Sequence, residues 1–440
     1  MSVFMQLLER LFQLSKHKVT VKSEIIAGIS TFLTMAYIIL VNPAILSHAN
    51  MDPGATFVAT CLVTALACFL TGVLSNYPIA VAPAMALNAY FSFVVVQGMG
   101  YSWQTALGAV LISGFLFLLI AITPMRRWLI DAIPQTMIMA ITAGLGFFIA
   151  MIGLHTGGLI QTDKNTLLSL GNVHSVPTIL FFLGFCMIVA LDYLRVKGAI
   201  IIGIIGITVI GLITGNGQFD GIVSAPPSLA PTFLQFNFQG LFTHAGFSVV
   251  FAFFLVSLFD STGTFIGILH QAGLFRSSKK DGKPLARGLL ATSIGSMAGG
   301  LLGTSSLSPY CESAAGVRAG GRTGLTSVVV SALFLVCLFF SPLTKTIPAY
   351  ATSSALLFVG CLMIKSFTHF NWENMTETIP SVITAIMIPL TFSISVGIGL
   401  GFISYVLIKL MTGKIKEVHP MLMVWALIFI VYFINSAHVV

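Results

Sequence analysis

Residues 303–316 read GTSSLSPYCESAAG, a polar segment inside an otherwise apolar part of the chain. Its first half is rich in Ser and Thr, and only the part after Pro309 is typical of a helix. We therefore expect a short extended piece followed by a half-helix. A second interrupted segment, PIAVAPAMALNAYF at residues 78–91, carries Pro78 and Pro83, which cannot both lie within one continuous helix.

Both interrupted segments fall where the chain is apolar enough to cross a membrane. Irregular backbone at membrane depth is tolerated only where protein or a water-filled cavity satisfies its polar groups. Matching broken helices in the two halves of a transporter mark its binding site. The sequence therefore predicts a site formed by residues 78–91 and 303–316.

The composition predicts an all-α polytopic membrane protein, because 57% of the 440 residues are hydrophobic and only 8% are charged. The apolar runs are continuous, as in helices, and do not alternate as in strands. The net charge of +8 does not indicate a nucleic-acid partner, because the basic residues lie in short loops between the runs. The six Cys form no CxxC pair, so we expect neither disulfides nor a metal, and no cofactor.

Fourteen apolar runs are candidate transmembrane spans. They fall at about 24–46, 55–75, 78–98, 103–122, 134–153, 177–193, 197–215, 244–268, 288–303, 304–320, 324–341, 348–366, 376–392 and 393–411. The stretch 420–436 is either a further span or an interfacial helix. Residues 1–22 have helical apolar spacing beside basic residues, which predicts an amphipathic segment on the cytoplasmic surface.

The distribution of basic residues supports fourteen spans with a cytoplasmic N-terminus. This arrangement leaves 19 of the 21 Lys and Arg residues inside, with Lys164 and Lys345 outside. Fourteen spans suggest two units of seven, and a seven-span unit ends on the side opposite its start, so its duplicate is inverted. Span three carries Ala82-Pro83-Ala84 and span ten Ser308-Pro309-Tyr310, which we interpret as equivalent segments.

Two carboxylates lie inside apolar spans. Asp260 is in LVSLFDSTGT at residues 255–264, and Glu312 follows Pro309 by three residues. A charge at the centre of a transmembrane helix costs roughly 2.5–3.5 kcal/mol on insertion scales. A purine has N–H donors and ring-nitrogen acceptors, which an ionised carboxylate and a protonated one respectively can satisfy. We expect Asp260 to bind and release a proton; for each acid a purely structural role is the alternative.

Six motifs along the chain resemble the azaguanine-type purine permeases of the nucleobase:cation symporter superfamily. They are TFLTMAY (31–37), APAMALNAYF (82–91), FDSTGT (259–264), ESAAG (312–316), GGRTGL (320–325) and GIGLGF (397–402). The resemblance implies a uracil-permease-like inverted repeat of fourteen spans, with broken spans three and ten. It also implies uptake coupled to protons and a possible homodimer through the gate domain.

The resemblance divides the chain into a core domain, which holds the base, and a gate domain, against which the core moves. The expected segments are 1–22 (cytoplasmic N-terminus), 23–122 (core), 123–215 (gate), 216–243 (extracytoplasmic loop), 244–341 (core), 342–411 (gate) and 412–440 (C-terminal segment).

The resemblance also implies which residues bind substrate. Asp260 and Glu312 are expected to contact the base and couple it to protons, with the broken backbone at Ala84, Tyr310, Cys311 and Ser313 completing the site. The neighbouring candidates are Asn88, Thr264, Phe259, Thr34 and Tyr37. For Asn88 the alternative is a bond between helices, for Thr264 a bond to its own helix, and for Phe259 simple packing.

We therefore expect a plasma-membrane secondary transporter that imports a purine nucleobase, adenine first, by proton symport and alternating access. A guanine/hypoxanthine symporter of the same family is the alternative. An anion transporter of the same architecture is disfavoured, because Asp260 and Glu312 would repel its substrate. An enzyme is not expected, because the sequence shows no nucleophile–base pair and no metal cluster.

Overall fold

The computed structural model describes residues 3–123, 134–163, 167–274, 282–370 and 372–436. The chain forms two compact units, the first from residues 1–122 and 153–356 and the second from residues 123–152 and 357–440. Six basic residues counted in the charge distribution lie outside the described ranges: Arg126, Arg127, Lys164, Arg276, Lys279 and Lys280. The division into core and gate domains stays a prediction.

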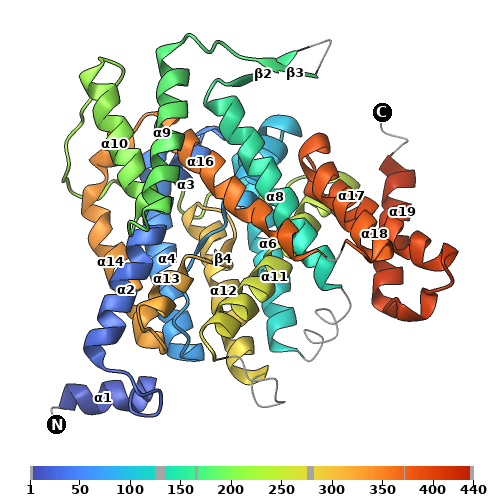
Figure 1. Cartoon of the computed structure of the whole chain (residues 1–440), viewed down its shortest axis with the longest axis horizontal. Coiled ribbons are helices and arrows are strands. Elements are labelled where there is room, and N and C mark those ends of the chain that lie inside the picture. Colours follow the sequence, from blue (N-terminus) through green and yellow to red (C-terminus); the bar gives the residue numbers. More distant parts are fainter. Residues whose placement is uncertain (1–2, 124–133, 164–166, 275–281, 371, 437–440) are drawn as a thin grey trace. The chain divides into compact units, whose positions relative to one another are not determined.

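The first unit is a layered bundle of helices with a small two-stranded sheet inside it (Figure 1). Its helices are α1 (Val3–Phe12), α2 (Val21–Met35), α3 (Ile38–Ser47), α4 (Pro53–Ser75), α5 (Met85–Ala89), the π-helix η1 (Tyr90–Gly98), α6 (Trp103–Ile122), α9 (Val176–Tyr193), α10 (Ala199–Ile213), α11 (His244–Gln271), α12 (Gly282–Leu302), α13 (Ser313–Arg318), α14 (Gly324–Cys337), η2 (Leu338–Phe340) and α15 (Pro342–Thr346).

The two interrupted segments fold as expected from their proline and serine content. Residues 78–98 form β1 (Val81–Pro83), then α5 and η1, and residues 304–320 form β4 (Leu307–Pro309), then α13. The two strands pair with each other in the middle of the first unit, next to α4, α11 and α12 (Figure 1). A separate hairpin, β2 (Ile160–Asp163) and β3 (Leu167–Leu170), lies at the surface.

The second unit contains most of α8 (Gln135–Thr156) and the C-terminal part of α16 (Ala349–Ile364). The remaining elements are η3 (Lys365–His369), α17 (Met375–Thr391), α18 (Ile394–Met411), η4 (Ile415–Glu417) and α19 (Pro420–Ser436). Glycines allow its helices to approach closely, because a Cβ at Gly401 would collide with Thr384 and one at Gly397 with Ile388.

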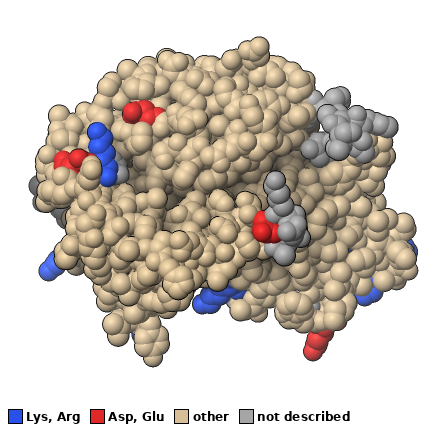
Figure 2. Space-filling model, turned by 90° about the horizontal axis from the view of Figure 1, so that it is seen from above, with Lys and Arg blue, Asp and Glu red and all other residues tan. Residues whose placement is uncertain are grey.

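The helices confirm the expected polytopic α-helical class. Among the described residues, nine helices are long and apolar enough to cross a membrane, and five shorter apolar helices accompany them. Several bounds agree closely with the sequence, for example α6 at 103–122. Lys, Arg, Asp and Glu are sparse on the face of the molecule that Figure 2 shows. The count of fourteen crossings stays a prediction.

The C-terminal stretch left open by the sequence forms α19, which presents no polar face among the side chains that the structure describes. Leu422, Trp425, Ala426 and Phe429 are buried, whereas the exposed side chains include Val424, Leu427, Ile428, Val431 and Ile434. An interfacial helix would need a polar face toward water. Phe429 packs against Gly399 and Phe402 in the first turns of α18, so α19 runs back antiparallel along α18. We infer that α19 crosses the membrane if α18 does.

This packing predicts the sides on which two positions lie. Reporters fused after Gly413, in the turn between α18 and α19, and after residue 440 should report opposite sides of the membrane. Alkaline phosphatase, active only outside, and green fluorescent protein, fluorescent only inside, would be compared at both positions. Equal signals at the two positions would show that α19 does not cross.

Candidate functional site

The site is built on the pairing of β1 with β4. The two strands are antiparallel, and Ala82 lies opposite Ser308 at the centre of the pairing. These are the same two residues that the sequence comparison of the halves treats as equivalent. Because equivalent residues face each other, a local two-fold axis passes between them, as an inverted repeat requires.

Backbone hydrogen bonds on either side of the strands follow the same symmetry. The Ala84 N–H donates to the Ser306 carbonyl and the Tyr310 N–H donates to the Ala80 carbonyl, both at 2.9 Å. Ala84 is the equivalent of Tyr310, and Ala80 is the equivalent of Ser306. The polar backbone of the broken spans is therefore satisfied by the partner span, which is how it can lie inside the bundle.

The side chains do not follow this symmetry, and they provide the polar groups of the site. Glu312 is the residue before α13 and is half-buried. The Tyr37 hydroxyl, in the bend between α2 and α3, donates to Glu312 Oε1 at 2.5 Å. The Cys311 thiol donates to Glu312 Oε2 at 3.4 Å, and the Thr34 hydroxyl lies 3.4 Å from the Glu312 carbonyl oxygen. Both carboxylate oxygens of Glu312 thus have a proton donor from the protein.

The second carboxylate, Asp260, is placed next to the same broken segment by α11. The Ser308 hydroxyl is its hydrogen-bond partner, and it lies within electrostatic range of Tyr310 and Cys311. Asp260 is half-buried, so its carboxylate is not sealed within the packing. The structure therefore brings Asp260 and Glu312 to one place, since both lie within electrostatic range of Tyr310 and Cys311.

Neither carboxylate is neutralised by a basic residue. Within the described ranges the salt bridges are those of Lys409, and neither Asp260 nor Glu312 is paired with Lys or Arg. A buried charge without a counter-ion is costly, so these positions favour a bound proton or a ligand with N–H donors. This arrangement suits a neutral, polar, flat molecule better than an anion.

Asn88 on α5 is placed behind the strands and is fully buried. Its Oδ1 accepts a hydrogen bond from the Ser305 hydroxyl, while its Nδ2 has no partner among the described residues. Thr304, which precedes Ser305 in the chain, accepts a hydrogen bond from the Asn42 side-chain amide. The same amide also donates to the Thr60 hydroxyl. Asn88 thus ties the first broken span to the second, and its free amide hydrogens leave it able to support a ligand.

The remaining candidates from the sequence fall into two groups. Ala84 caps α5 and Ser313 accepts a bond from the Ala80 N–H at 3.0 Å, so both hold the backbone of the site. Phe259 is buried beside Asp260, and Thr264 lies one helical turn further along α11 and is half-buried. A direct contact of either residue with a substrate stays a prediction.

Two site residues were not singled out by the sequence. Ser308 is the hydrogen-bond partner of Asp260, and Ser305 that of Asn88. Both lie in the quoted polar segment, whose several Ser and Thr residues gave no signal that distinguishes these two from the others. Their partners could not be inferred because the partner of each serine lies 48 or more residues away in the sequence.

Helix α2, which carries Thr34 and leads into the bend at Tyr37, is also fastened to α13, to α14 and to the turn between them. Glu24 on α2 is fully buried, and its carboxylate accepts hydrogen bonds from the Thr326 hydroxyl at 2.6 Å and from the Arg322 N–H at 2.8 Å. Gly316 on α13 lies so close to α2 that a Cβ there would collide with Thr31. These contacts hold Glu312 in a fixed position relative to Tyr37.

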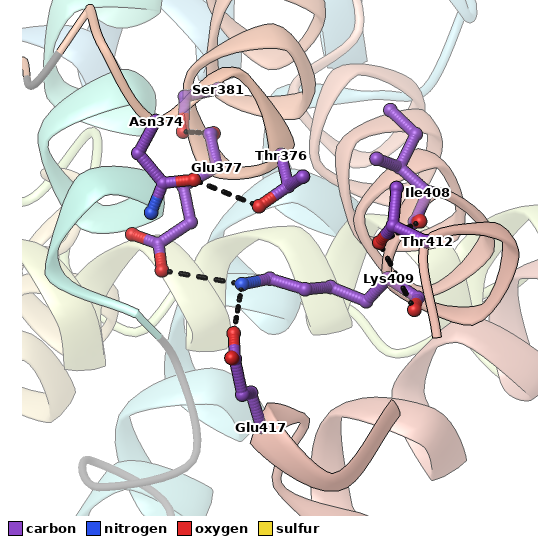
Figure 3. A network of polar contacts seen from close by, with 8 residues as sticks. All are labelled: Asn374, Thr376, Glu377, Ser381, Ile408, Lys409, Thr412 and Glu417. Atoms are coloured by element: carbon purple, nitrogen blue, oxygen red, sulfur yellow. Dashed lines mark hydrogen bonds and ion pairs between the residues drawn. The ribbon is translucent and has the colours of Figure 1, made fainter. Parts of the chain in front are cut away.

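A separate polar network lies in the second unit (Figure 3). The Lys409 ammonium is almost completely buried and pairs with Glu417 at 2.6 Å and Glu377 at 3.5 Å. It also lies 5.6 Å from the centre of the Tyr405 ring. Its hydrogen bond holds the pKa of the Glu417 carboxyl below its usual value. The network fastens the segment between α18 and α19 to the start of α17, which is a structural role.

The Permease family model matches residues 22–400 of the chain. The chain is 45% identical over 424 residues to Adenine permease AdeP of Escherichia coli (strain K12), which covers 96% of this chain and 95% of the relative. It is 41% identical over 429 residues to Guanine/hypoxanthine permease PbuO of Bacillus subtilis (strain 168), which covers 96% of this chain and 99% of the relative.

Solved structures share the fold at much lower identity. The transmembrane domain of the cyanobacterium bicarbonate transporter BicA matches with a TM-score of 0.66 and 14% identity, over 86% of this chain and 97% of that one. SLC26A9 matches with a TM-score of 0.68 and 12% identity, over 93% of this chain and 69% of that one. At identities this low, the structural matches establish the fold alone. That fold agrees with the architecture expected from the sequence.

Proposed function

This chain belongs to the permease family whose model matches residues 22–400, and from that premise we propose that it imports a purine base, adenine, together with a proton. The similarity to adenine and guanine/hypoxanthine permeases over nearly the whole chain makes it a multi-pass membrane transporter of nucleobases. The resemblance seen in the sequence motifs is thereby confirmed. The base, the proton and the residues that bind them are the proposal.

One observation carries the proposal: Asp260 and Glu312 both lie close to Cys311, and neither has a basic partner among the described residues. A neutral purine brings N–H donors that a carboxylate can accept and ring nitrogens that a protonated carboxyl, a thiol or an amide can satisfy. In a site with little water, a polar group left unpaired is costly, which makes these bonds selective.

Proton coupling follows from the same pair of groups. Each carboxylate lies inside the bundle without a basic partner among the described residues, so a proton entering with the base would relieve the cost of keeping the group ionised there. When the site opens to the cytoplasm, release of the base and of the proton restores the starting state. We further propose that the protein resides in the plasma membrane with its N-terminus inside, and that it dimerises through the gate domain.

The relatives support adenine over the alternative base. AdeP is 45% identical and Adenine permease AdeQ of Escherichia coli (strain K12) 43% identical, against 41% for PbuO. A guanine/hypoxanthine symporter remains the alternative, since those relatives share the same fold over the same length. The fold is shared with a bicarbonate transporter, but Asp260 and Glu312 disfavour an anion.

Uptake of labelled adenine tests the proposal. Cells that lack their own purine permeases and express this chain should accumulate labelled adenine, and a protonophore should abolish that accumulation. A tenfold excess of unlabelled adenine should suppress uptake more than the same excess of hypoxanthine or guanine. Sulfate and bicarbonate should have no effect, because an anion is repelled by the two carboxylates.

The control is the same host carrying the empty vector. If hypoxanthine or guanine suppresses uptake more than adenine does, the preferred substrate is the alternative base and not adenine. Uptake of sulfate or bicarbonate without uptake of any purine would favour an anion transporter.

A further inference from the structure

The two oxygens of the Glu312 carboxylate are held by donors of very different strength. The Tyr37 hydroxyl is buried and its bond to Oε1, at 2.5 Å, is short, as expected of a hydrogen bond to an ionised group. The Cys311 thiol is exposed, and its bond to Oε2, at 3.4 Å, is that of a weak donor. Oε2 and the thiol are therefore the part of this group that a ligand can reach.

This pair offers a ligand one acceptor and one donor side by side. The Cys311 side chain can rotate its hydrogen away from Oε2 toward a bound molecule, which frees Oε2 to accept a bond. A purine that presents an N–H next to a ring nitrogen matches both atoms. Adenine does so, because its exocyclic amino group lies beside ring nitrogens that accept hydrogen bonds.

Guanine is matched differently. Its ring N–H and its 2-amino group are two donors side by side, and they fit best to a carboxylate whose two oxygens are both free. At Glu312 the Tyr37 hydroxyl holds Oε1, so the two guanine donors meet one acceptor, Oε2, and one donor, the Cys311 thiol. An unpaired donor in such a site lowers affinity.

We propose that Cys311 is a specificity-determining residue, whose thiol favours adenine over guanine because it places a hydrogen-bond donor beside the acceptor Oε2 of Glu312. This inference rests on the proposed function, since it concerns the choice between bases at the same site. The contact with Glu312 gives Cys311 a role beyond its place in the broken backbone of the site.

Two substitutions separate the donor from the volume of the side chain. In Cys311→Ala the donor is lost, and in Cys311→Ser a donor is kept in a side chain of similar small size. The concentration of unlabelled guanine and of unlabelled adenine that halves the uptake of labelled adenine would be measured in each variant. The ratio of the two values does not depend on how much protein reaches the membrane.

In Cys311→Ala we expect this ratio to shift toward guanine by about tenfold, the size of one hydrogen bond, because adenine loses the thiol donor and guanine no longer meets it. Cys311→Ser should stay within about threefold of the wild type. Hypoxanthine, which lacks the 2-amino group, should gain less than guanine in Cys311→Ala. Cys186→Ala, which changes an exposed cysteine on α9, is the matched control and should leave the ratio unchanged.

An unchanged ratio in Cys311→Ala would overturn the inference, as would equal shifts in the Ala and Ser variants, which would indicate that volume decides. A wild type that prefers guanine would overturn it as well. Failure of the proposed function looks different, because then the wild type would take up no purine base at all.

Discussion

Replacing Asp260 by Asn is expected to abolish the proton-driven accumulation of the base. Asn has nearly the same shape as Asp and can still accept a bond from the Ser308 hydroxyl, but it cannot bind and release a proton. One pH unit across the membrane is worth 1.36 kcal/mol, so a carrier moving one proton with each base can accumulate it about tenfold. The variant should only equilibrate the base across the membrane.

Vesicles with an imposed pH gradient provide the measurement. With the outside more acidic by one pH unit, the wild type should concentrate labelled adenine inside, and Asp260→Asn should reach equal concentrations on both sides. Asp192→Asn removes an exposed carboxylate at the end of α9 and is the matched control, expected to behave as the wild type. Full accumulation in Asp260→Asn would show that the coupling proton binds elsewhere.

The sequence predicted the fold well where local chemistry decides it. Pro78 and Pro83 forbid a continuous helix, and the Ser-rich approach to Pro309 favours an extended piece, so both breaks were expected. The structure confirmed both and added their pairing. That pairing joins residues more than 220 positions apart, and only the inverted repeat gave a hint of it.

The site was predicted in part, for a related physical reason. An acidic residue within an apolar segment can be recognised in a single sequence, because a charge inside the membrane has a high free-energy cost and therefore needs a reason. Asp260 and Glu312 were found in this way. Serines and threonines carry no such cost, so the partners Ser308 and Ser305 could not be identified. The bond between Tyr37 and Glu312 depends on the close approach of α2 and α13, which is set by small residues such as Gly316 and by the buried Glu24.

Replacing Glu312 by Gln is expected to weaken binding of every purine base by about a hundredfold or more. The carboxylate accepts bonds at both oxygens, from Tyr37 and Cys311, whereas an amide accepts at one end only and donates at the other. The amide nitrogen would face the hydroxyl or the thiol as a second donor. Losing the bond from the base N–H to this charged acceptor costs about 1.5–3 kcal/mol, and the unpaired amide donor adds to that cost, which together correspond to the expected hundredfold effect.

Binding of labelled adenine to the purified protein measures this effect without any contribution from coupling. Tyr37→Phe should have a smaller effect, about tenfold, because it removes one donor and leaves the carboxylate able to accept from the base. Glu373→Gln, at an exposed position before α17, is the matched control and should bind as the wild type does. Undiminished affinity of Glu312→Gln for adenine, guanine and hypoxanthine would remove Glu312 from the site. Asp260 would then be left as the single acceptor for the N–H groups of the base.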